Sequence, residues 1–309
     1  MRPLERNNNY FTVHGIHKQS YDGLVDMHTH LRGDTADSPT RILRTAKRRG
    51  LTGIVVTDHD RLRHLPRLIE LNDKLKLGLD IFPGVESTAI VSNKTGESNK
   101  KAKHVLVFLS QHDSLTTEVP CYMPVDELNT YVHERGGKTA IAHPFLWDRN
   151  SLNESEILDA QNTGDTKKRF DFIEGHHGGV LNLLAFENKH PRVTARMRKL
   201  GLMPPIVDTN QKSQTLFRQK QQELGLTGIT SGSDAHSTEH IGDVGISYNR
   251  SVGLFQSIQA GEYAILERQY RRPPSTRREE ILGTLGGWKM EVERRFGING
   301  FVIYDKTTN

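Results

Sequence analysis

The sequence predicts one α/β domain in which short apolar strands alternate with amphipathic helices. The chain has 309 residues, 35% of them hydrophobic and 26% charged, which is the balance of a globular protein with a substantial core. From about residue 20 onward, apolar runs alternate with amphipathic stretches, a rhythm typical of β/α units. Polar residues collect where the apolar runs end, as they do at the ligand-binding edge of parallel sheets.

Eight segments have the length and composition of buried strands, and helices with recognisable ends lie between them. One helix begins at Pro39 after the capping residue Ser38, runs to Arg49 and stops at Gly50. A second begins near Pro124 and ends before Gly136-Gly137, and a third covers Gln211–Leu224 and stops at Gly225. The expected strands are Gly23–Thr29, Gly53–Asp58, Asp80–Glu86, Val105–Ser110, Lys138–His143, Asp171–Glu174, Pro205–Asp208 and Thr227–Ser233.

The remaining segments predict additions to this domain. Residues 1–20 are expected to be an N-terminal leader, residues 21–270 the α/β domain and residues 271–309 a C-terminal extension with a helix around 278–296 and a strand-like tail. Ser92–Lys103 is polar and predicts an exposed loop. Residues 176–204 are interpreted as an insertion, part loop and part helix, and helix-rich packing is expected after Gly245.

Composition excludes several classes of protein. A single cysteine, Cys121, excludes an internal disulfide framework and cysteine-based zinc fingers. No apolar run approaches the roughly 20 residues needed to cross a bilayer, and the first residues lack the apolar stretch of a signal peptide. We therefore expect a cytoplasmic protein with no membrane partner. The net charge of +5 includes basic runs at 41–49, 192–199 and 268–278, which are either solvated helix faces or a field that attracts phosphate-bearing partners.

Residues of metal-binding types follow five of the predicted strands. Because residues two apart on an extended segment project to the same side, His28 and His30 can hold one ion together, as can Asp234 and His236. Imidazole and carboxylate ligands without thiolates suit Zn²⁺, Mn²⁺ or Fe²⁺. The strand ends are Asp26-Met27-His28-Thr29-His30, Thr57-Asp58-His59-Asp60, Pro83-Gly84-Val85-Glu86, Ala142-His143-Pro144 and Gly232-Ser233-Asp234-Ala235-His236.

Each strand end alone has an ordinary alternative. His59 could be a buried structural histidine, His143 could simply end its strand before Pro144, and Glu86 could be a surface carboxylate. Five such endings in one chain favour a metal centre instead. A carboxylate such as Glu86 can bridge two cations, and ions roughly 3.5–4 Å apart can share a hydroxide that is nucleophilic at neutral pH.

In this order the five motifs resemble the PHP (polymerase and histidinol phosphatase) family, over roughly Asp22 to Leu266. The helix that stops at Gly50 and the Gly261-Glu262 turn also fit. The resemblance implies a distorted seven-stranded (β/α) barrel that carries two or three divalent ions (Mn, Fe or Zn) and hydrolyses phosphomonoesters or phosphodiesters. Because eight strands are predicted, either Asp171–Glu174 or Pro205–Asp208 is expected to be wrong or to belong to the insertion.

Carried over position by position, the resemblance implies three ion sites. The first would use His28, His30, Glu86 and Asp234, and the second would share Glu86 and add His104 and His143. The third would use Asp34, His59 and His236. Asp37 lies close enough in the sequence to compete with Asp34, and His104 could instead be a loop histidine. Among these ligands we expect Glu86, Asp234 and His236 to act in catalysis.

Other polar residues are expected to support this centre. Asp26 and Asp58 are interpreted as carboxylates that accept a ring N–H from ligand histidines, or else as ordinary strand-end aspartates. Glu174 ends a predicted strand, at a place where the family often has a carboxylate, and direct ligation by it is not expected. Arginine can grip phosphate bidentately, and the HHGG segment is either a source of contacts or a tight turn. The expected substrate contacts are Arg32, His176, His177, Arg192 and Arg196.

The sequence therefore predicts a metal-dependent phosphoesterase. We expect an in-line attack on phosphorus by a metal-bridging hydroxide, with cations neutralising the phosphate oxygens. The substrate is expected to be a phosphate-bearing small molecule or a short nucleic acid. Three alternatives stay open: a histidinol-phosphate-type phosphatase, an amidohydrolase or TatD-like deoxyribonuclease barrel, and a non-catalytic metal-stabilised module that binds nucleic acid.

Overall fold

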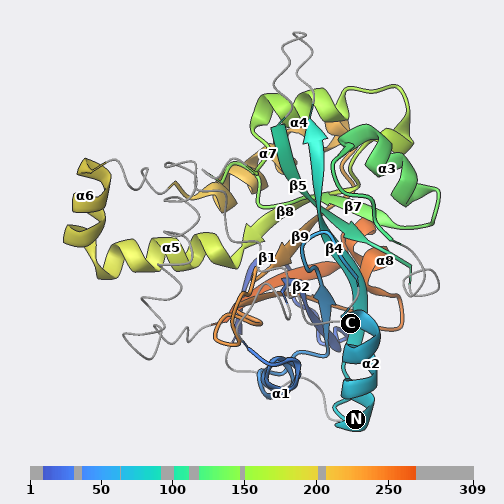
Figure 1. The fold of residues 1–309 in the computed structure, drawn as a ribbon, viewed down its shortest axis with the longest axis vertical. Coiled ribbons are helices and arrows are strands. Elements are labelled where there is room, and N and C mark those ends of the chain that lie inside the picture. Colours follow the sequence, from blue (N-terminus) through green and yellow to red (C-terminus); the bar gives the residue numbers. More distant parts are fainter. Residues whose placement is uncertain are drawn as a thin grey trace, which may run out of the picture. The chain divides into compact units, whose positions relative to one another are not determined.

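The computed structural model describes residues 10–30, 37–62, 64–91, 101–110, 118–146, 150–200 and 207–268. The chain divides into two compact units, and helix α6 (Pro191–Lys199) belongs to the second of them. All the elements discussed below, apart from α6, belong to the first unit. Figure 1 shows the elements coloured in the order of the sequence. Within the described ranges, no helix is both long and apolar enough to span a membrane.

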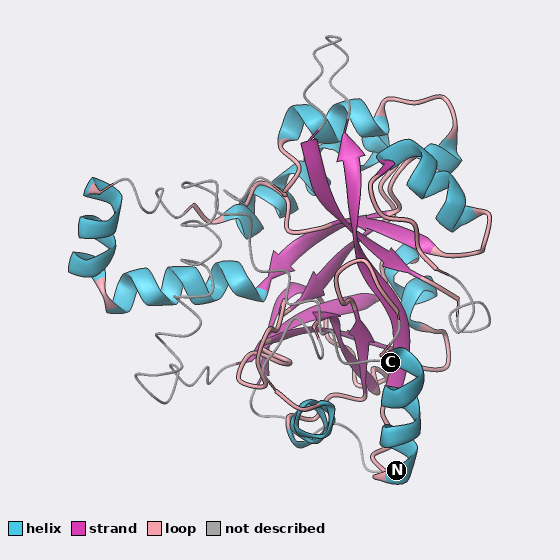
Figure 2. Cartoon of the chain, viewed as in Figure 1, coloured by secondary structure: helices cyan, strands magenta, loops and turns pink. Residues whose placement is uncertain are grey.

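The described strands, magenta in Figure 2, form one mixed sheet. Their order is β1-β11-β10-β2-β3-β4-β5-β7-β8-β9, with β6 beside β4. Neighbours are parallel from β2 to β4 and from β7 to β9, whereas β5 is antiparallel to both β4 and β7. At the other end β1, β11, β10 and β2 pair antiparallel. The strands are β1 (Tyr10–Gly15), β2 (Gly23–Thr29), β3 (Gly53–Val56), β4 (Asp80–Val91), β5 (Lys101–Phe108), β6 (Met123–Pro124), β7 (Lys138–Ile141), β8 (Phe172–His177), β9 (Gly228–Gly232), β10 (Val244–Tyr248) and β11 (Tyr263–Arg268).

The sheet curls, so that the carboxyl end of β9 returns to the carboxyl end of β2. The Asp234 amide donates to the carbonyl of His28 at 2.8 Å, and the His30 amide donates to the carbonyl of Ala235 at 3.1 Å. Gly232 permits this approach, because a Cβ atom there would overlap the Cβ of His28. The polar residues that follow β2 and β9 are therefore brought side by side.

Apolar side chains on both faces of the strands build the core. On one face, Ile42 and Leu43 of α1 and Leu68 of α2 pack with Ile54 of β3, so both helices cover this part of the sheet. The buried residues of each helix form one apolar stripe, as expected of an amphipathic helix that packs against a sheet. The helices of the first unit are α1 (Pro39–Arg48), α2 (Leu65–Lys74), α3 (Val125–His133), α4 (Glu154–Gln161), α5 (Gly178–Lys189), α7 (Thr209–Leu224) and α8 (Leu254–Gln259), with a 3₁₀ turn over Thr166–Lys168.

The predicted caps of α1 and α7 are confirmed, although α7 begins at Thr209 rather than Gln211 and α1 ends at Arg48 rather than Arg49. The Ser38 hydroxyl accepts from the amide of Arg41 at 3.3 Å and Pro39 occupies the first position of α1. Gly50, after α1, and Gly225, which caps α7, have φ angles of +82° and +68°, the left-handed conformation that glycine adopts most readily.

Two predicted strands are longer than expected. β4 continues past Glu86 to Val91, and β5 begins at Lys101 rather than Val105, so Glu86 and His104 lie inside an antiparallel pair. The apolar alternation of β4 continues through Ala89 and Val91, and Lys101–Lys103, expected to be loop, pairs with this extension.

The other corrections concern strands that depend on tertiary pairing. Residues 10–15, which were expected to belong to a leader, form β1. β10 and β11 form where helix-rich packing was expected. Each of these short strands is stabilised by pairing with its neighbours in the sheet. The doubtful Asp171–Glu174 strand exists and extends to His177, so His176 and His177 belong to β8 rather than to an insertion, and α5 and α6 follow. Asp208 caps α7 and belongs to no strand. The expected helix around 278–296 and the tail lie outside the described residues.

Candidate metal centre

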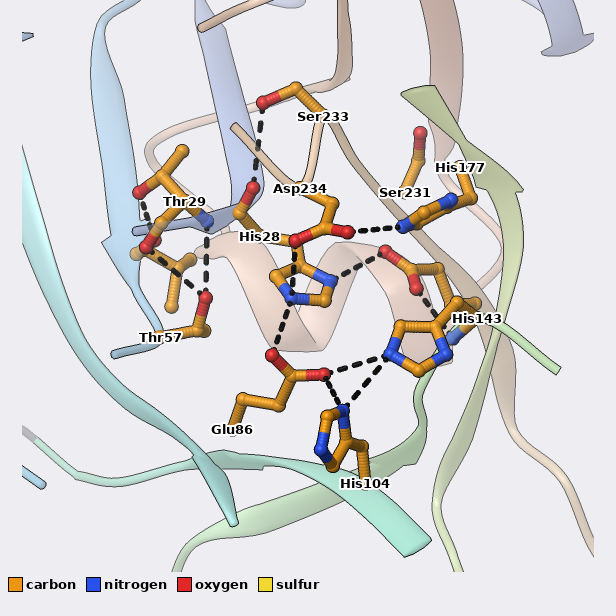
Figure 3. A network of polar contacts seen from close by, with 12 residues as sticks. His28, Thr29, Thr57, Glu86, His104, His143, His177, Ser231, Ser233 and Asp234 are labelled. Atoms are coloured by element: carbon orange, nitrogen blue, oxygen red, sulfur yellow. Dashed lines mark hydrogen bonds and ion pairs between the residues drawn. The ribbon is translucent and has the colours of Figure 1, made fainter. Parts of the chain in front are cut away.

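Histidines and carboxylates from seven strands converge at one edge of the curled sheet. Eight of the nine expected ligands are described, and Asp34, like Arg32, lies outside the described ranges. Among the described residues, ligand atoms within 4.8 Å of one another form four groups. These groups are His28, His30, Glu86 and Asp234; His59, Glu86 and His104; His30, His59 and His236; and His28, Glu174 and His177. Figure 3 shows part of this centre around Glu86.

Glu86 lies at the middle of the centre, with only 1% of its surface exposed. Its Oε2 atom lies 3.3 Å from Nε2 of His28 and 3.3 Å from Nε2 of His30. Its Oε1 atom lies 2.8 Å from both Nδ1 of His104 and Nε2 of His143 (Figure 3). One carboxylate therefore faces two separate sets of nitrogen donors, one with each oxygen.

Asp234 completes the first set. Its Oδ1 atom lies 2.9 Å from Nε2 of His30 and 3.5 Å from Nε2 of His28, while its Oδ2 atom lies 3.2 Å from Nε2 of His177. These contacts bring together the four residues that the resemblance assigns to one ion. Imidazole nitrogens and carboxylate oxygens at this spacing fit a transition-metal cation or Zn²⁺.

The two other expected sites are brought together in part. His104 Nδ1 lies 3.4 Å from His143 Nε2, so the second set, with Glu86, is assembled. His59 and His236 lie together with His30. The carboxylates beside them are ones that they share with the other sets, Glu86 at 3.3 Å from Nδ1 of His59 and Asp234 at 3.4 Å from Nδ1 of His236. Asp37, the competitor of Asp34, instead accepts from the amide of Thr238 at 2.6 Å and pairs with Arg41 at 2.7 Å.

Opposite charges set the ionisation of the buried carboxylates. Burial alone would raise the pKa of Glu86, but the imidazoles of His104, His28 and His59 hold that pKa well below its usual range. Burial alone would also raise the pKa of Asp234, but the imidazoles of His236 and His28 hold that pKa well below its usual range. Both carboxylates are therefore anionic at neutral pH, the state in which a carboxylate binds a cation.

Glu174 supports two ligand histidines from behind. Its Oε1 atom lies 3.1 Å from Nδ1 of His28, and its Oε2 atom accepts from the backbone amide of His143 at 2.7 Å. When the His28 ring donates its Nδ1–H to Glu174, the lone pair of Nε2 is left facing Glu86 and Asp234. In the group of His28, Glu174 and His177, the Glu174 carboxylate already engages Nδ1 of His28 and the amide of His143.

Asp26 acts differently from the expectation. Its carboxylate accepts from the amides of Ser233 at 2.9 Å, His28 at 3.3 Å and Gly242 at 2.7 Å, and from the Ser233 hydroxyl at 2.5 Å, not from a ring N–H. Burial raises its pKa to about 6, against these hydrogen bonds. Asp26 thus fixes the backbone that carries the ligands. Asp58 is also buried, and its carbonyl accepts from the amide of Glu86 at 3.3 Å.

The expected substrate contacts separate into different places. His177 points to Asp234, and its Nδ1 accepts from the amide of Val180 at 3.4 Å, whereas the adjacent His176 pairs with Glu267 at 3.0 Å. This split follows from the alternation of side chains along a strand. Of the remaining expected contacts, Arg192 and Arg196 lie on α6, in the second unit.

Two ligands of the centre, His143 and Asp234, have a strained backbone, as does Asp60, which follows His59. Asp60, His143 and Asp234 have positive φ angles of 53°, 25° and 52°, in the region that non-glycine residues rarely adopt. Such residues cluster at functional sites, where the surrounding structure holds them in place. Here the Asp60 carboxylate is fixed by the amide and hydroxyl of Thr88, at 2.6 and 2.9 Å.

The centre is closed on one side and open on the other. His28 and His30 are fully buried, while the side chains of His59 and His236 are 32% and 47% exposed. Among the described residues of the centre, the side chains of His59 and His236 are therefore the most exposed to solvent.

Comparison with known proteins supports the fold. No family model matches the sequence, and no curated protein matches it either. Among solved structures, PsfC from Pseudomonas syringae PB-5123 is 17% identical, covers 87% of this chain and 98% of its own, and gives a TM-score of 0.51. An amidohydrolase from Chromobacterium violaceum gives 0.46, with 14% identity over 80% of this chain and 98% of its own. A Bifidobacterium adolescentis protein to which metal-dependent phosphoesterase activity is ascribed gives 0.43, with 17% identity over 69% and 88%.

At 17% identity the likeness to PsfC bears on the fold alone, and the two weaker likenesses add nothing to it. The fold and the centre together define an α/β protein with a curled mixed sheet and a buried cluster of histidines and carboxylates of metal-ligating type. This arrangement agrees with the resemblance of the sequence to the PHP family.

Proposed function

We propose that this protein is a metal-dependent phosphoesterase of the PHP type. In this proposal β2, β3, β4, β5, β7, β8 and β9 are the seven strands of a distorted barrel, with residues 21–270 as its domain. The observation that carries the proposal is the position of Glu86, whose two oxygens face His28 and His30 on one side and His104 and His143 on the other. A structural metal site needs only one set of ligands, whereas a bridging carboxylate is typical of multinuclear hydrolytic centres.

In this proposal the residues of the centre have different roles. When bound, divalent cations supply an activated water and neutralise the charge of a phosphate group. Glu86 and Asp234 provide the buried negative charge that holds such cations, and Glu174 keeps the Nε2 lone pair of His28 directed at them. The open side at His59 and His236 leaves room for a phosphate ester to enter.

The substrate class follows from the same features. The net charge of +5 favours an anionic substrate, and a phosphomonoester, a phosphodiester or the end of an oligonucleotide would each meet the exposed histidines first. We propose a cytoplasmic location, because a chain with a single cysteine has no internal disulfide and suits a reducing compartment. A histidinol-phosphate-type phosphatase remains one member of this class.

The proposal is tested by metal analysis and a substrate screen. The purified chain should contain Mn, Fe or Zn and should hydrolyse at least one of a panel of phosphomonoesters, phosphodiesters and short single strands in Mn²⁺. His28→Ala and Asp234→Ala should each lose metal and activity, whereas His17→Ala, outside the centre, should keep both. Full activity in both ligand variants would refute the proposal. Bound metal without turnover, together with salt-sensitive nucleic-acid binding, would favour the non-catalytic module.

A further inference from the structure

His143 is oriented by a serine that the resemblance does not assign. Its Nε2 atom faces Glu86 at 2.8 Å, and its Nδ1 atom lies 2.6 Å from the hydroxyl oxygen of Ser151. An imidazole that offers the Nε2 lone pair to a cation carries its proton on Nδ1, so a hydrogen-bond acceptor at Nδ1 fixes both the tautomer and the ring plane. Ser151 is buried, with 4% of its surface exposed.

A buried ion pair holds Ser151 in place. The ammonium of Lys103 donates to the carbonyl of Ser151 at 2.6 Å and pairs with Oε2 of Glu156 at 3.0 Å. Lys103 and Glu156 are only 5% and 4% exposed. Glu156 lies in the first turn of α4, and its carboxylate is fixed there because it accepts from the amide of Asn153 at 2.9 Å.

The same strand carries a ligand and this ion pair. Lys103 and His104 are consecutive on β5, so their side chains point to opposite faces, His104 toward Glu86 and Lys103 toward α4. The amide of His104 also donates to the carbonyl of Asn150 at 2.7 Å. β5 therefore holds this turn through the carbonyls of two consecutive residues, Asn150 and Ser151. The Ser151 hydroxyl, which contacts His143, lies on the second of them.

Stability alone gives a weak reason for such a pair. Removing two charges from water costs several kcal/mol for each ion, and a well-packed apolar pair is often as stable. A salt bridge between Lys103 and Glu156 does, however, fix the position of the Ser151 carbonyl in a way that apolar side chains cannot. Ser151 is attached at both its carbonyl and its hydroxyl, so the ring of His143 is held at a defined angle.

We propose that Ser151 is a positioning residue for His143, and that the Lys103–Glu156 ion pair serves to fix Ser151. The three residues would then set the affinity of the ion site formed by Glu86, His104 and His143, and leave the site at His28, His30 and Asp234 unchanged. This rests on the proposed function only in requiring that cations bind at these residues.

The test measures cation binding by the full chain without substrate. The metal-free protein is titrated with Co²⁺, followed by its d–d absorption, and with Mn²⁺, followed by calorimetry. Ser151→Ala should weaken one class of site by about 10–100-fold and leave the other unchanged, while Ser151→Thr, which keeps the hydroxyl, should restore it. Ser213→Ala, which deletes a buried hydroxyl that donates to the Thr209 carbonyl, is the matched control and should bind like the wild type.

A double variant keeps the proposal testable if Ser151→Ala fails to fold. Lys103→Met with Glu156→Leu removes both charges together, so no unpaired buried charge remains, and it should weaken the same class of site selectively. Wild-type binding by a folded Ser151→Ala or by this double variant would overturn the proposal, as would loss of both classes together. A wild type that binds both ions without hydrolysing any ester refutes the proposed function and leaves the role of Ser151 standing.

Discussion

Glu86→Gln is the substitution to which the centre should respond most strongly. The change keeps the size of the side chain but removes one negative charge and replaces one of two ligand oxygens with an NH₂ group. Both oxygens are used, because Oε2 lies 3.3 Å from His28 and Oε1 lies 2.8 Å from His104 and from His143. At an effective dielectric constant of about 20, unit charges about 4 Å apart interact by about 4 kcal/mol. A cation bound by this carboxylate would lie nearer than 4 Å, since metal–oxygen bonds are about 2 Å long, so this energy is a lower bound.

An energy of about 4 kcal/mol corresponds to roughly a thousandfold in Kd. We therefore expect Glu86→Gln to bind the more weakly held of its two cations at least about a thousandfold less tightly than the wild type does. Loss of this cation should also abolish hydrolytic activity. The assay is Mn²⁺ titration of the metal-free chain, with metal content after dialysis as a second readout. Glu262→Gln, in an exposed pair with Lys18 at 3.7 Å, is the matched charge control. If Glu86→Gln bound two ions within tenfold of the wild type, the bridging role of this carboxylate would be refuted.

Two further predictions concern the scaffold. Gly232→Ala should destabilise the fold by about 3 kcal/mol and reduce metal binding, because its Cβ would overlap the backbone and Cβ of His28, whereas Gly164→Ala has open space and should be neutral in urea unfolding. The ion pair of His133 with Asp171 should give a pH-dependent stability. Burial alone would lower the pKa of His133, but the hydrogen bond and charge of Asp171 raise it, and the pKa of Asp171 is lowered, against its burial, by His133 and by its other hydrogen bonds. The pair therefore stabilises the fold fully from about pH 4 to about pH 6.5, and its contribution is lost as pH rises through the raised pKa of His133. Because His133 is half-buried, the unfolding free energies of His133→Gln and the wild type should differ by about 1 kcal/mol at pH 5.5 and converge by pH 9. A constant difference across this range would contradict the assignment.

The positions of the candidate ligands could be predicted from the sequence because they depend on a simple rule. Residues at the ends of parallel strands meet at one edge of the sheet, and this places His28, His30 and Asp234 together without any knowledge of the loops. The same rule brings His143, which follows β7, to Glu86 in this centre. Glu86 and His104 also lie in the centre, but from the middle of two long antiparallel strands. Their positions agree with the resemblance, whereas the strand-end rule does not explain them.

The features that the sequence did not predict depend on tertiary pairing and on the directions of side chains. His177 was not expected beside Asp234, because β8 was predicted to end at Glu174; a strand three residues longer, with its alternation, would have separated His177 from His176. The partners of Asp26 are backbone amides from three segments, which no local pattern reveals. β1 was missed because a short edge strand is stable only beside β11, a partner far away in the sequence.

The left-handed backbone at His143 and Asp234 has a consequence for how this protein could change. Glycine adopts such a conformation most readily, so a glycine at either position would relax the chain while deleting a ligand. Selection for heat resistance alone would then tend to erase the centre, and only selection for its chemistry would keep these two side chains. A lineage that lost the activity would be expected to show glycine there early, with the surrounding sheet intact.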